Sequence, residues 1–220
     1  MSQTAGKIKR GDLGHVESIR PQERPAARAR VHVFHHSLDE DTHLRSIAEA
    51  DAEELFALVD ANRAHLREWL PWVDANTEVT HTRQFIASAV KQNEDELGLT
   101  CVIVQGGRIV GIVGYHPINQ ANKSVEIGYW LSREVVGRGL MTRSCGALID
   151  HAFGVLGLNR VAIPAAVGNA RSRAIPERLG FTNEGITREA EWLYDRWVDH
   201  VRYSLLAREW VKRAEDGSLR

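Results

Sequence analysis

The stretch EIGYWLSREVVGRGLMT, residues 126–142, decides the fold of this chain. It runs from an apolar segment that reads as a β-strand, through a short turn, into a helix that begins near Gly137 and Gly139. Backbone N–H groups in a first helical turn have no partner within the helix, and the helix dipole is positive there. Residues 137–142, called the cradle below, therefore predict an anion site. Nearby arginines add positive charge where a pyrophosphate would lie: Arg133, Arg138 and Arg143.

Two glycines at this spacing also suit an ordinary strand-to-helix turn, and a second motif in the chain is more specific. That motif is GNARSRAIPERLGF, residues 168–181, which follows a predicted strand at residues 160–167. Together the two stretches resemble the GCN5-related N-acetyltransferases, whose acetyl-CoA loop is written Gln/Arg-x-x-Gly-x-Gly/Ala. Residues 134–139 follow this loop except at the first position, where Glu134 stands.

The details are similar to the RimJ/RimL-type subgroup of that family, named for the N-terminal acetylation of ribosomal proteins. Four short patterns carry the likeness: Gly137-Arg-Gly-Leu-Met-Thr142, Asn169-x-x-Ser172, Leu179-Gly180-Phe181 and Trp69-Leu-Pro-Trp72. The subgroup often has Gln where Val136 stands, but the backbone of the loop can bind phosphate without that side chain. The resemblance covers residues 42–210.

The resemblance implies an α/β fold, with a mixed, mostly antiparallel central sheet that splays in the middle to hold CoA and is flanked by helices. In the family, the strand that ends at the cradle carries a bulge and parts from the next strand, and the pantetheine arm lies in the opening. Pro164 fits a strand without a neighbour because proline cannot donate to a ladder, although an edge position explains it equally well.

Acetyl-CoA is the co-substrate that the resemblance implies, without a metal. Backbone N–H groups near Trp130 and Leu131 are expected to point at the thioester carbonyl and to stabilise an oxyanion. Asn169 stands at a helix-cap position, from which its amide could instead reach the pantetheine arm. The residues expected to contact the co-substrate are Trp130, Leu131, Val136, Gly137, Arg138, Gly139, Leu140, Met141, Thr142 and Asn169.

Two side chains are candidates for the proton transfers of a direct acetyl transfer. By resemblance to the RimL-type pattern, Glu191 accepts the amine proton, directly or through one water; the alternative is a strand-end carboxylate paired with Arg188 or Arg196. Ser172 is the candidate for protonating the CoA thiolate; the alternative is a first-turn serine that satisfies a backbone group. Pro176, four residues later, removes the helical hydrogen bond to the Ser172 carbonyl.

The acceptor is expected to be a primary amine. Trp69, Trp72 and Tyr129 are candidates for the acceptor pocket, although aromatic side chains in these places are more often core. The subgroup name implies a protein N-terminal α-amine. A small amine is the alternative, namely a polyamine, an amino-sugar antibiotic or a peptide antibiotic. A module that binds acetyl-CoA without turnover is a further alternative, against which the presence of both Glu191 and Ser172 argues.

Composition limits the other classes of function. The chain has 220 residues, a net charge of −1 and an isoelectric point near 6.8, so attraction of the whole molecule to nucleic acid or an anionic membrane is not implied. Two cysteines offer no disulfide framework, which fits a cytoplasmic protein. Adjacent His35 and His36, near His32, face opposite sides of a strand, and no Cys/Asp cluster completes a metal site.

The expected organisation is a basic N-terminal tail at residues 1–30, one acetyltransferase domain at 31–212 and a C-terminal tail at 213–220. The tail is either a solvated leader or a weak contact to a polyanion such as ribosomal RNA. Aromatic and aliphatic strands at residues 188–193 and 198–206 are expected to pair at the far edge of the sheet. Because exposed edges invite a second subunit, and RimL-like proteins often dimerise, we expect a homodimer.

Hydrophobic spacing predicts the remaining elements. Short strands are expected on both sides of an acidic turn at residues 38–41, followed by a helix that begins at Asp51, with Glu54 completing a capping box. Its apolar stripe ends at Pro71. The other expected elements are a helix at 82–97, a hairpin at 101–115, a strand at 125–131 and a helix at 139–156 closed by Gly157.

Overall fold

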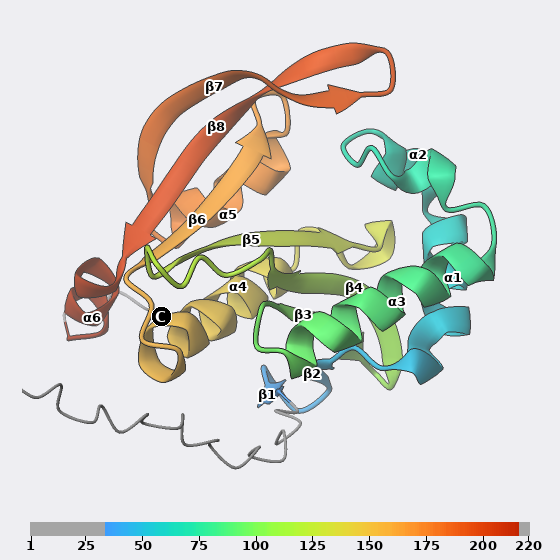
Figure 1. Ribbon diagram of the computed structural model, residues 1–220, viewed down its shortest axis with the longest axis horizontal. Helices are drawn as coiled ribbons and strands as arrows, with labels where there is room; N and C mark the ends of the chain where they lie inside the picture. Colours follow the sequence, from blue (N-terminus) through green and yellow to red (C-terminus); the bar gives the residue numbers. More distant parts are fainter. Residues whose placement is uncertain (1–33, 216–220) are drawn as a thin grey trace, which may run out of the picture.

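The computed structural model describes residues 34–215, in which a single eight-stranded sheet has the order β1-β2-β3-β4-β5-β6-β8-β7 (Figure 1). Every neighbouring pair is antiparallel except β5 and β6, which are parallel. The α/β class and the mixed, mostly antiparallel sheet expected from the sequence are thus confirmed. The strands are β1 (His35–Ser37), β2 (Thr42–Ser46), β3 (Leu99–Gln105), β4 (Arg108–Tyr115), β5 (Ser124–Leu131), β6 (Arg160–Ala166), β7 (Thr182–Leu193) and β8 (Arg196–Leu206).

Helices cover both faces of the sheet (Figure 1). On one face, α1 (Ala52–Ala61) and α3 (Val79–Glu94) pack against alternate side chains of β3 such as Val102. On the other face, α4 (Leu140–Asp150) and α5 (Ala170–Arg178) share a core with the intervening side chains of β3. The remaining helical segments are α2 (Arg63–Arg67), α6 (Ala207–Glu215), single 3₁₀ turns at Glu49–Asp51, Val73–Ala75 and Arg133–Val135, and a π turn at His151–Val155 that continues α4.

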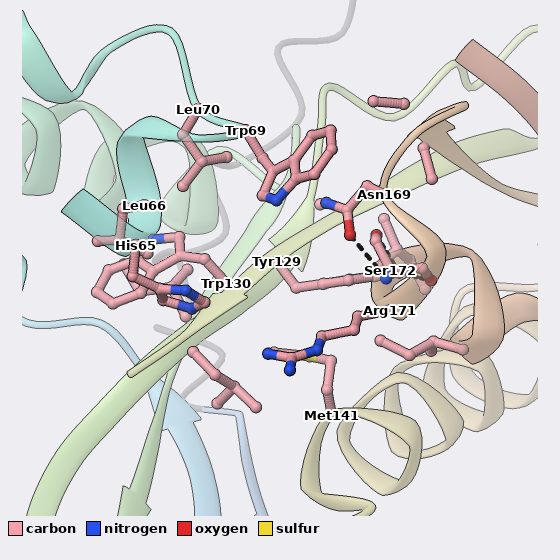
Figure 2. Close-up of a pocket in the computed structure, with 18 of the residues that line it drawn as sticks. His65, Leu66, Trp69, Leu70, Tyr129, Trp130, Met141, Asn169, Arg171 and Ser172 are labelled. Atoms are coloured by element: carbon pink, nitrogen blue, oxygen red, sulfur yellow. Dashed lines mark hydrogen bonds between the residues drawn. The ribbon is translucent and has the colours of Figure 1, made fainter. Parts of the chain in front are cut away.

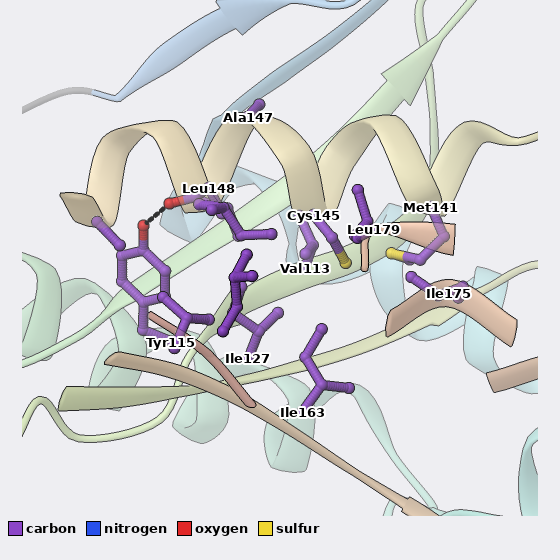
Figure 3. Close-up of a cluster of buried hydrophobic side chains, with 14 of the residues drawn as sticks. Val113, Tyr115, Ile127, Met141, Cys145, Ala147, Leu148, Ile163, Ile175 and Leu179 are labelled. Atoms are coloured by element: carbon purple, nitrogen blue, oxygen red, sulfur yellow. Dashed lines mark hydrogen bonds between the residues drawn. The ribbon is translucent and has the colours of Figure 1, made fainter. Parts of the chain in front are cut away.

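The larger core fixes α4 against the middle of the sheet, and Figure 3 shows its apolar side facing β4, β5 and β6. Cys145 and Leu148 are fully buried there. The hydroxyl of Tyr115, on β4, donates a hydrogen bond to the Leu148 carbonyl near the end of the helix. Because the side chains of α4 interlock with the sheet, the first turn of α4 and the cradle before it are held in a fixed place.

The start of α1 differs from the expected capping box. Asp51 is not the cap of a box with Glu54; it closes a 3₁₀ turn, where its carboxylate accepts the Ala48 N–H at 2.9 Å and pairs with Arg45 at 2.6 Å. Glu54 instead reaches the sheet and accepts the N–H of Ile109 at 2.7 Å. Arg45 and the backbone N–H of Ile109 thus bind the two carboxylates, and neither carboxylate caps α1 through its side chain.

The first long helix is also divided. Leu55, Val59 and Leu66 are buried as the apolar stripe predicts, but α1 ends at Ala61 and α2 begins at Arg63. Asn62 lies between them, and its amide oxygen accepts the N–H of Arg133 at 2.9 Å, just before the cradle. A contact between residues far apart in sequence therefore places α2 over one end of β5.

The parting of β5 and β6 is the feature of the sheet that matters most for the site. The two strands pair only where Ser124–Glu126 lies beside Arg160–Ala162, and Pro164 follows within β6. Pro164 faces β8 on its other side, so it lies inside the sheet beside an opening and not at an outer edge. The ladder between β4 and β5 has no register shift from Gly111 to Tyr115, so the bulge expected in β5 is not found there.

The C-terminal strands pair at the edge of the sheet as predicted, and β7 begins earlier than expected, at Thr182. A further helix, α6, follows β8 and runs past residue 212, where the domain was expected to end. Within residues 34–215, none of the helices is long and apolar enough to cross a membrane. The expected tail at residues 1–30 and His32 lie outside the described residues.

Candidate active site

A groove of about 2040 Å³ passes through the opening between β5 and β6. Its walls are the cradle, the first turn of α5, the α2 region and the β7–β8 hairpin. It brings together every side chain predicted for catalysis, co-substrate binding or acceptor binding: Glu191, Ser172, Trp130, Leu131, Val136, Gly137, Arg138, Gly139, Leu140, Met141, Thr142, Asn169, Trp69, Trp72 and Tyr129. Glu134, the departure from the loop pattern, does not line the groove.

The cradle has the backbone of an anion site. Gly137 and Gly139 have φ angles of +87° and +71°, which favour glycine. Gly139 is the N-cap of α4 and offers no side chain to its first turn, so the N–H groups of Leu140, Met141 and Thr142 keep their free hydrogen-bonding capacity. Apart from the adjacent residues in the chain, no atom of the described part of the protein lies within 4 Å of the position that a Cβ would take at either glycine. The cradle is therefore open to a ligand.

Arginine side chains surround this open backbone. Arg138 is exposed at the tip of the cradle, while Arg143 is held by Asp39 at 3.0 Å. Arg178, from α5, donates to the Thr142 hydroxyl at 3.2 Å. Arg171, which the sequence argument missed, extends from α5 toward Met141 in Figure 2. Both α4 and α5 thus supply cations to the same end of the groove, where a polyphosphate is favoured.

The backbone of β5 offers further donors along the opening. His116 N–H donates to the Glu126 carbonyl, and Ser132 N–H donates to the Val110 carbonyl, at the two ends of the β4–β5 ladder. Hydrogen-bonding direction alternates along an antiparallel strand. The N–H of Trp130 therefore faces β4, whereas the N–H groups of Tyr129 and Leu131 face the opening. The N–H of Leu131 thus faces the opening, whereas the N–H of Trp130 does not, although the Trp130 side chain lines the groove.

Ser172 lies at the first turn of α5, beside Tyr129. Asn169 caps this helix as predicted, accepting the Ser172 N–H at 3.0 Å (Figure 2). The Ser172 hydroxyl does not satisfy a helix backbone group; it donates to the Tyr129 hydroxyl at 3.1 Å. Tyr129 in turn donates to the Ser172 carbonyl at 3.1 Å. Burial raises the pKa of Tyr129, so its phenol stays protonated.

Glu191 lies beside His200, from the neighbouring strand. Their side chains approach to 3.5 Å and are 34% and 18% exposed, respectively. Neither arginine considered from the sequence takes the place of His200, and Arg196 is instead next to Asp195 at 3.4 Å. His200 was missed because two register shifts in the β7–β8 ladder, between Asn183 and Ile186 and between Thr187 and Glu191, bring it near Glu191.

The Glu191–His200 pair and the Ser172–Tyr129 pair lie on opposite faces of the sheet. Side chains alternate along a strand: Val201 and Tyr203 of β8 are part of the core under α4, so His200 is on the other face, the face of α1 and α3. Tyr129 packs against the α4 core, on the same face as α5 and Ser172. A carboxylate and a hydroxyl therefore approach the opening from its two sides, as transfer between two bound molecules requires.

Aromatic rings form the wall on the carboxylate side. Trp69 lies against the turn before α5, where a methyl group added at Gly168 would be 3.3 Å from its ring. Trp72 and Trp130 have ring centroids 6.3 Å apart. Phe85, from α3, also lines the groove, and nearly half of its surface is exposed. The groove thus combines an apolar wall with a nearby carboxylate.

The tip of the β7–β8 hairpin closes this wall. The Tyr194 hydroxyl donates to the Leu70 carbonyl at 2.6 Å, and the Arg67 guanidinium lies 3.9 Å from the centre of the Tyr194 ring. Asp74 holds the same guanidinium at 2.8 Å. This contact joins the segment after α2 to the hairpin, and the sequence gives no signal for it, because the two segments are 124 positions apart.

Comparisons with known proteins agree with this geometry. A family model described as acetyltransferase (GNAT) domain matches residues 41–182. The putative ribosomal N-acetyltransferase YdaF of Bacillus subtilis (strain 168) is 38% identical over 179 residues, which are 81% of this chain and 98% of that protein.

Two solved structures are similar to this chain over most of their own length. The microcin C7 self immunity acetyltransferase MccE, in complex with acetyl-CoA and AMP, is 30% identical and has a TM-score of 0.73, covering 77% of this chain and 94% of its own. RimL, a ribosomal L7/L12 alpha-N-protein acetyltransferase in complex with coenzyme A, is 28% identical and has a TM-score of 0.75, covering 79% and 98%.

Proposed function

This chain belongs to the GNAT family of acetyltransferases, and we propose that it transfers acetyl from acetyl-CoA directly to the α-amine of a protein N-terminus, of the ribosomal-protein type. It is an N-acetyltransferase whose co-substrate is acetyl-CoA, and its likeness to the RimJ/RimL-type subgroup is confirmed. One observation supports the proposal most: the groove passes through the parted sheet, with an anion cradle at one end and Glu191 beside His200 on the other face.

The residues of the cradle fit the polyphosphate of acetyl-CoA. Uncapped N–H groups at the start of α4 and the arginines of α4 and α5 bind the phosphates. The pantetheine arm lies between β5 and β6, where it pairs with the free side of β5. The N–H groups of Tyr129 and Leu131 then face the thioester carbonyl and stabilise the negative charge that forms on its oxygen.

Glu191 is the proposed base for the amine. An α-amine has a pKa of roughly 7.7 to 8, whereas a lysine side chain is near roughly 10.4, so an α-amine is already partly neutral at neutral pH. A carboxylate within reach of the amine, directly or through one water, can therefore accept the last proton. Ser172, on the opposite face, shares its proton with the CoA thiolate as the thiolate leaves.

The aromatic wall supports an acceptor of limited size at the reacting end. Trp69 and Trp72 flank the place where an extended N-terminus could enter, and the contact of Tyr194 with Leu70 bounds this entrance. The Tyr129 side chain, also expected to line the acceptor pocket, lies on the opposite face of the sheet beside Ser172. Similarity to MccE, which is named for immunity to the microcin C7, favours a second candidate, in which the acceptor is the amine of a small molecule or a peptide antibiotic.

We further propose a homodimer and a cytoplasmic location. Among the strands of residues 34–215, only β8 lies beside β7, whose residues 182–190 are exposed. Trp192 and Trp197 form an exposed edge-to-face pair on this hairpin, with 49% and 55% of their surfaces accessible. A second copy of the chain would cover them. Both cysteines are free and buried, which fits a reducing compartment.

A panel of acceptors tests the proposal. Thiol release from acetyl-CoA is measured with peptides that have a free N-terminus, with the same peptides blocked at the N-terminus but carrying lysine, and with polyamines. We expect release with free N-termini and mass spectra that place the acetyl group on the α-amine. Release only with polyamines or other small amines would replace the protein acceptor with the second candidate. No release with any amine would contradict both.

A further inference from the structure

Pro176 is an unusual residue for the position that it takes. It is buried inside α5, and as a proline it has no N–H to donate to the carbonyl four residues earlier, which belongs to Ser172. A helix interior normally excludes proline for this reason. The carbonyl of the proposed proton donor is therefore left without its usual helical partner.

Tyr129 takes the place of the missing N–H. Its hydroxyl donates to the Ser172 carbonyl at 3.1 Å. A phenol has one proton, so once that proton is on the carbonyl the phenol oxygen can only accept from its other neighbour. That neighbour is the Ser172 hydroxyl, whose oxygen is 3.1 Å away. A residue with a backbone N–H at position 176 could donate to the Ser172 carbonyl in place of Tyr129. The phenol proton could then turn to the Ser172 hydroxyl instead.

We propose that Pro176 and Tyr129 are positioning residues of this N-acetyltransferase: by leaving the Ser172 carbonyl to the Tyr129 hydroxyl, Pro176 fixes the direction of the proton between Tyr129 and Ser172 and holds the serine oxygen in one place in the groove. Asn169 completes the arrangement by holding the Ser172 N–H. The backbone and side chain of Ser172 are thus bound at three points, two of which belong to Tyr129.

The contacts of Ser172 with Tyr129 suit a hydroxyl that shares its proton with the CoA thiolate through a hydrogen bond. When the thiolate forms, the Ser172 O–H turns from Tyr129 to the sulfur, and the exchange of one hydrogen bond for another changes the energy little. Tyr129 keeps its proton on the carbonyl throughout, because a buried phenol is a poor acid. Tyr129 therefore acts through Ser172 and not on the substrate.

A double-mutant cycle on melting temperature tests the structural half, which does not depend on the proposed function. Tyr129→Phe leaves the Ser172 carbonyl without a donor and should lower the melting temperature by roughly 2–4 °C. In the Pro176→Ala background, the new N–H can bond to that carbonyl, so the same substitution should cost much less. Effects of Pro176→Ala on the unfolded chain cancel in the cycle.

Tyr203→Phe is the matched control. Tyr203 is also buried against α5, where it donates to Glu177 at 2.6 Å and accepts from Arg173 at 3.0 Å. Its loss should lower the melting temperature equally with and without Pro176→Ala. Equal losses for Tyr129→Phe in both backgrounds would overturn the proposed role of Pro176.

Turnover tests the second half, which rests on the proposed function. Tyr129→Phe should lower kcat by roughly 5- to 10-fold, the value of one hydrogen bond, with KM for acetyl-CoA unchanged. In the Ser172→Ala background it should have no further effect. Losses that multiply in the double variant would show that Tyr129 does not act through Ser172. A wild-type chain without turnover on any amine contradicts the proposed function, while the thermal cycle still decides the role of Pro176.

Discussion

Replacing Gly139 by alanine separates the backbone role of this glycine from its role in binding. Gly139 has φ +71° and ψ 0°, a left-handed conformation that costs an alanine roughly 1–2 kcal/mol. A Cβ there meets no atom within 4 Å among the non-adjacent residues of 34–215, so backbone strain is the main cost in the free protein. For a chain of this size, the melting temperature should fall by roughly 2–8 °C.

Binding should suffer more than stability does. The methyl group would stand in the open space of the cradle, next to the N–H groups of Leu140 and Met141 that would bind a phosphate. Losing one charge-assisted hydrogen bond, worth roughly 1.5–3 kcal/mol, weakens acetyl-CoA by roughly 10- to 150-fold. Calorimetric titration measures this change. Gly139→Glu should weaken binding further, because its carboxylate repels the phosphates.

Gly106→Ala supplies the control. Gly106 lies in the β3–β4 turn with φ +56°, its Cβ position is equally open, and it does not line the groove. It should lose similar stability and no affinity. If Gly139→Ala binds acetyl-CoA as tightly as Gly106→Ala does, the cradle does not bind the phosphates of acetyl-CoA.

Two further predictions concern the C-terminal half of the sheet. Hydrogen bonds from Arg160 lower the pKa of Glu184 from 4.5 to about 2. The stability that this carboxylate contributes is therefore present above about pH 4.5 and is lost as the pH falls toward 2. Because the Glu184 side chain is 38% exposed, this contribution to stability is small. The melting-temperature difference between wild type and Glu184→Gln should therefore close between pH 4.5 and 2, and a difference that stays constant would show that the ion pair contributes nothing. Replacing both Trp192 and Trp197 by serine should shift the chain from dimer to monomer in light scattering, and an unchanged mass would remove this hairpin from the interface.

Features encoded by a few neighbouring residues could be predicted from the sequence. The cradle follows from two glycines next to the start of a helix. The opening follows from the resemblance to the family, and Pro164 fits it without predicting it, because an edge strand would also accept a proline. The cap of α5 follows from Asn169 and its spacing to Ser172. The cradle and this cap each depend on the backbone chemistry of residues a few positions apart, so the sequence pattern alone indicates them.

Features that depend on distant contacts could not be predicted. The division between α1 and α2 is stabilised by Asn62 accepting the Arg133 N–H, 71 positions away. The approach of His200 to Glu191 depends on two register shifts in one ladder. Such contacts depend on the tertiary register, which hydrophobic spacing does not determine. Pro176 is an intermediate case: the sequence shows which hydrogen bond is missing, and the fold supplies Tyr129 as the replacement.

The pH dependence of turnover in wild type and Glu191→Gln, with a free N-terminal peptide as acceptor, measures whether Glu191 accepts the amine proton. Glu126→Gln is the control, since Glu126 is a carboxylate on the same face of the sheet, paired with Arg202 and outside the groove. We predict that Glu191→Gln loses about 100-fold in turnover at neutral pH with acetyl-CoA affinity unchanged, and that the loss shrinks as the pH rises above the amine pKa of roughly 8. Wild-type turnover by Glu191→Gln at neutral pH would show that Glu191 is not the base.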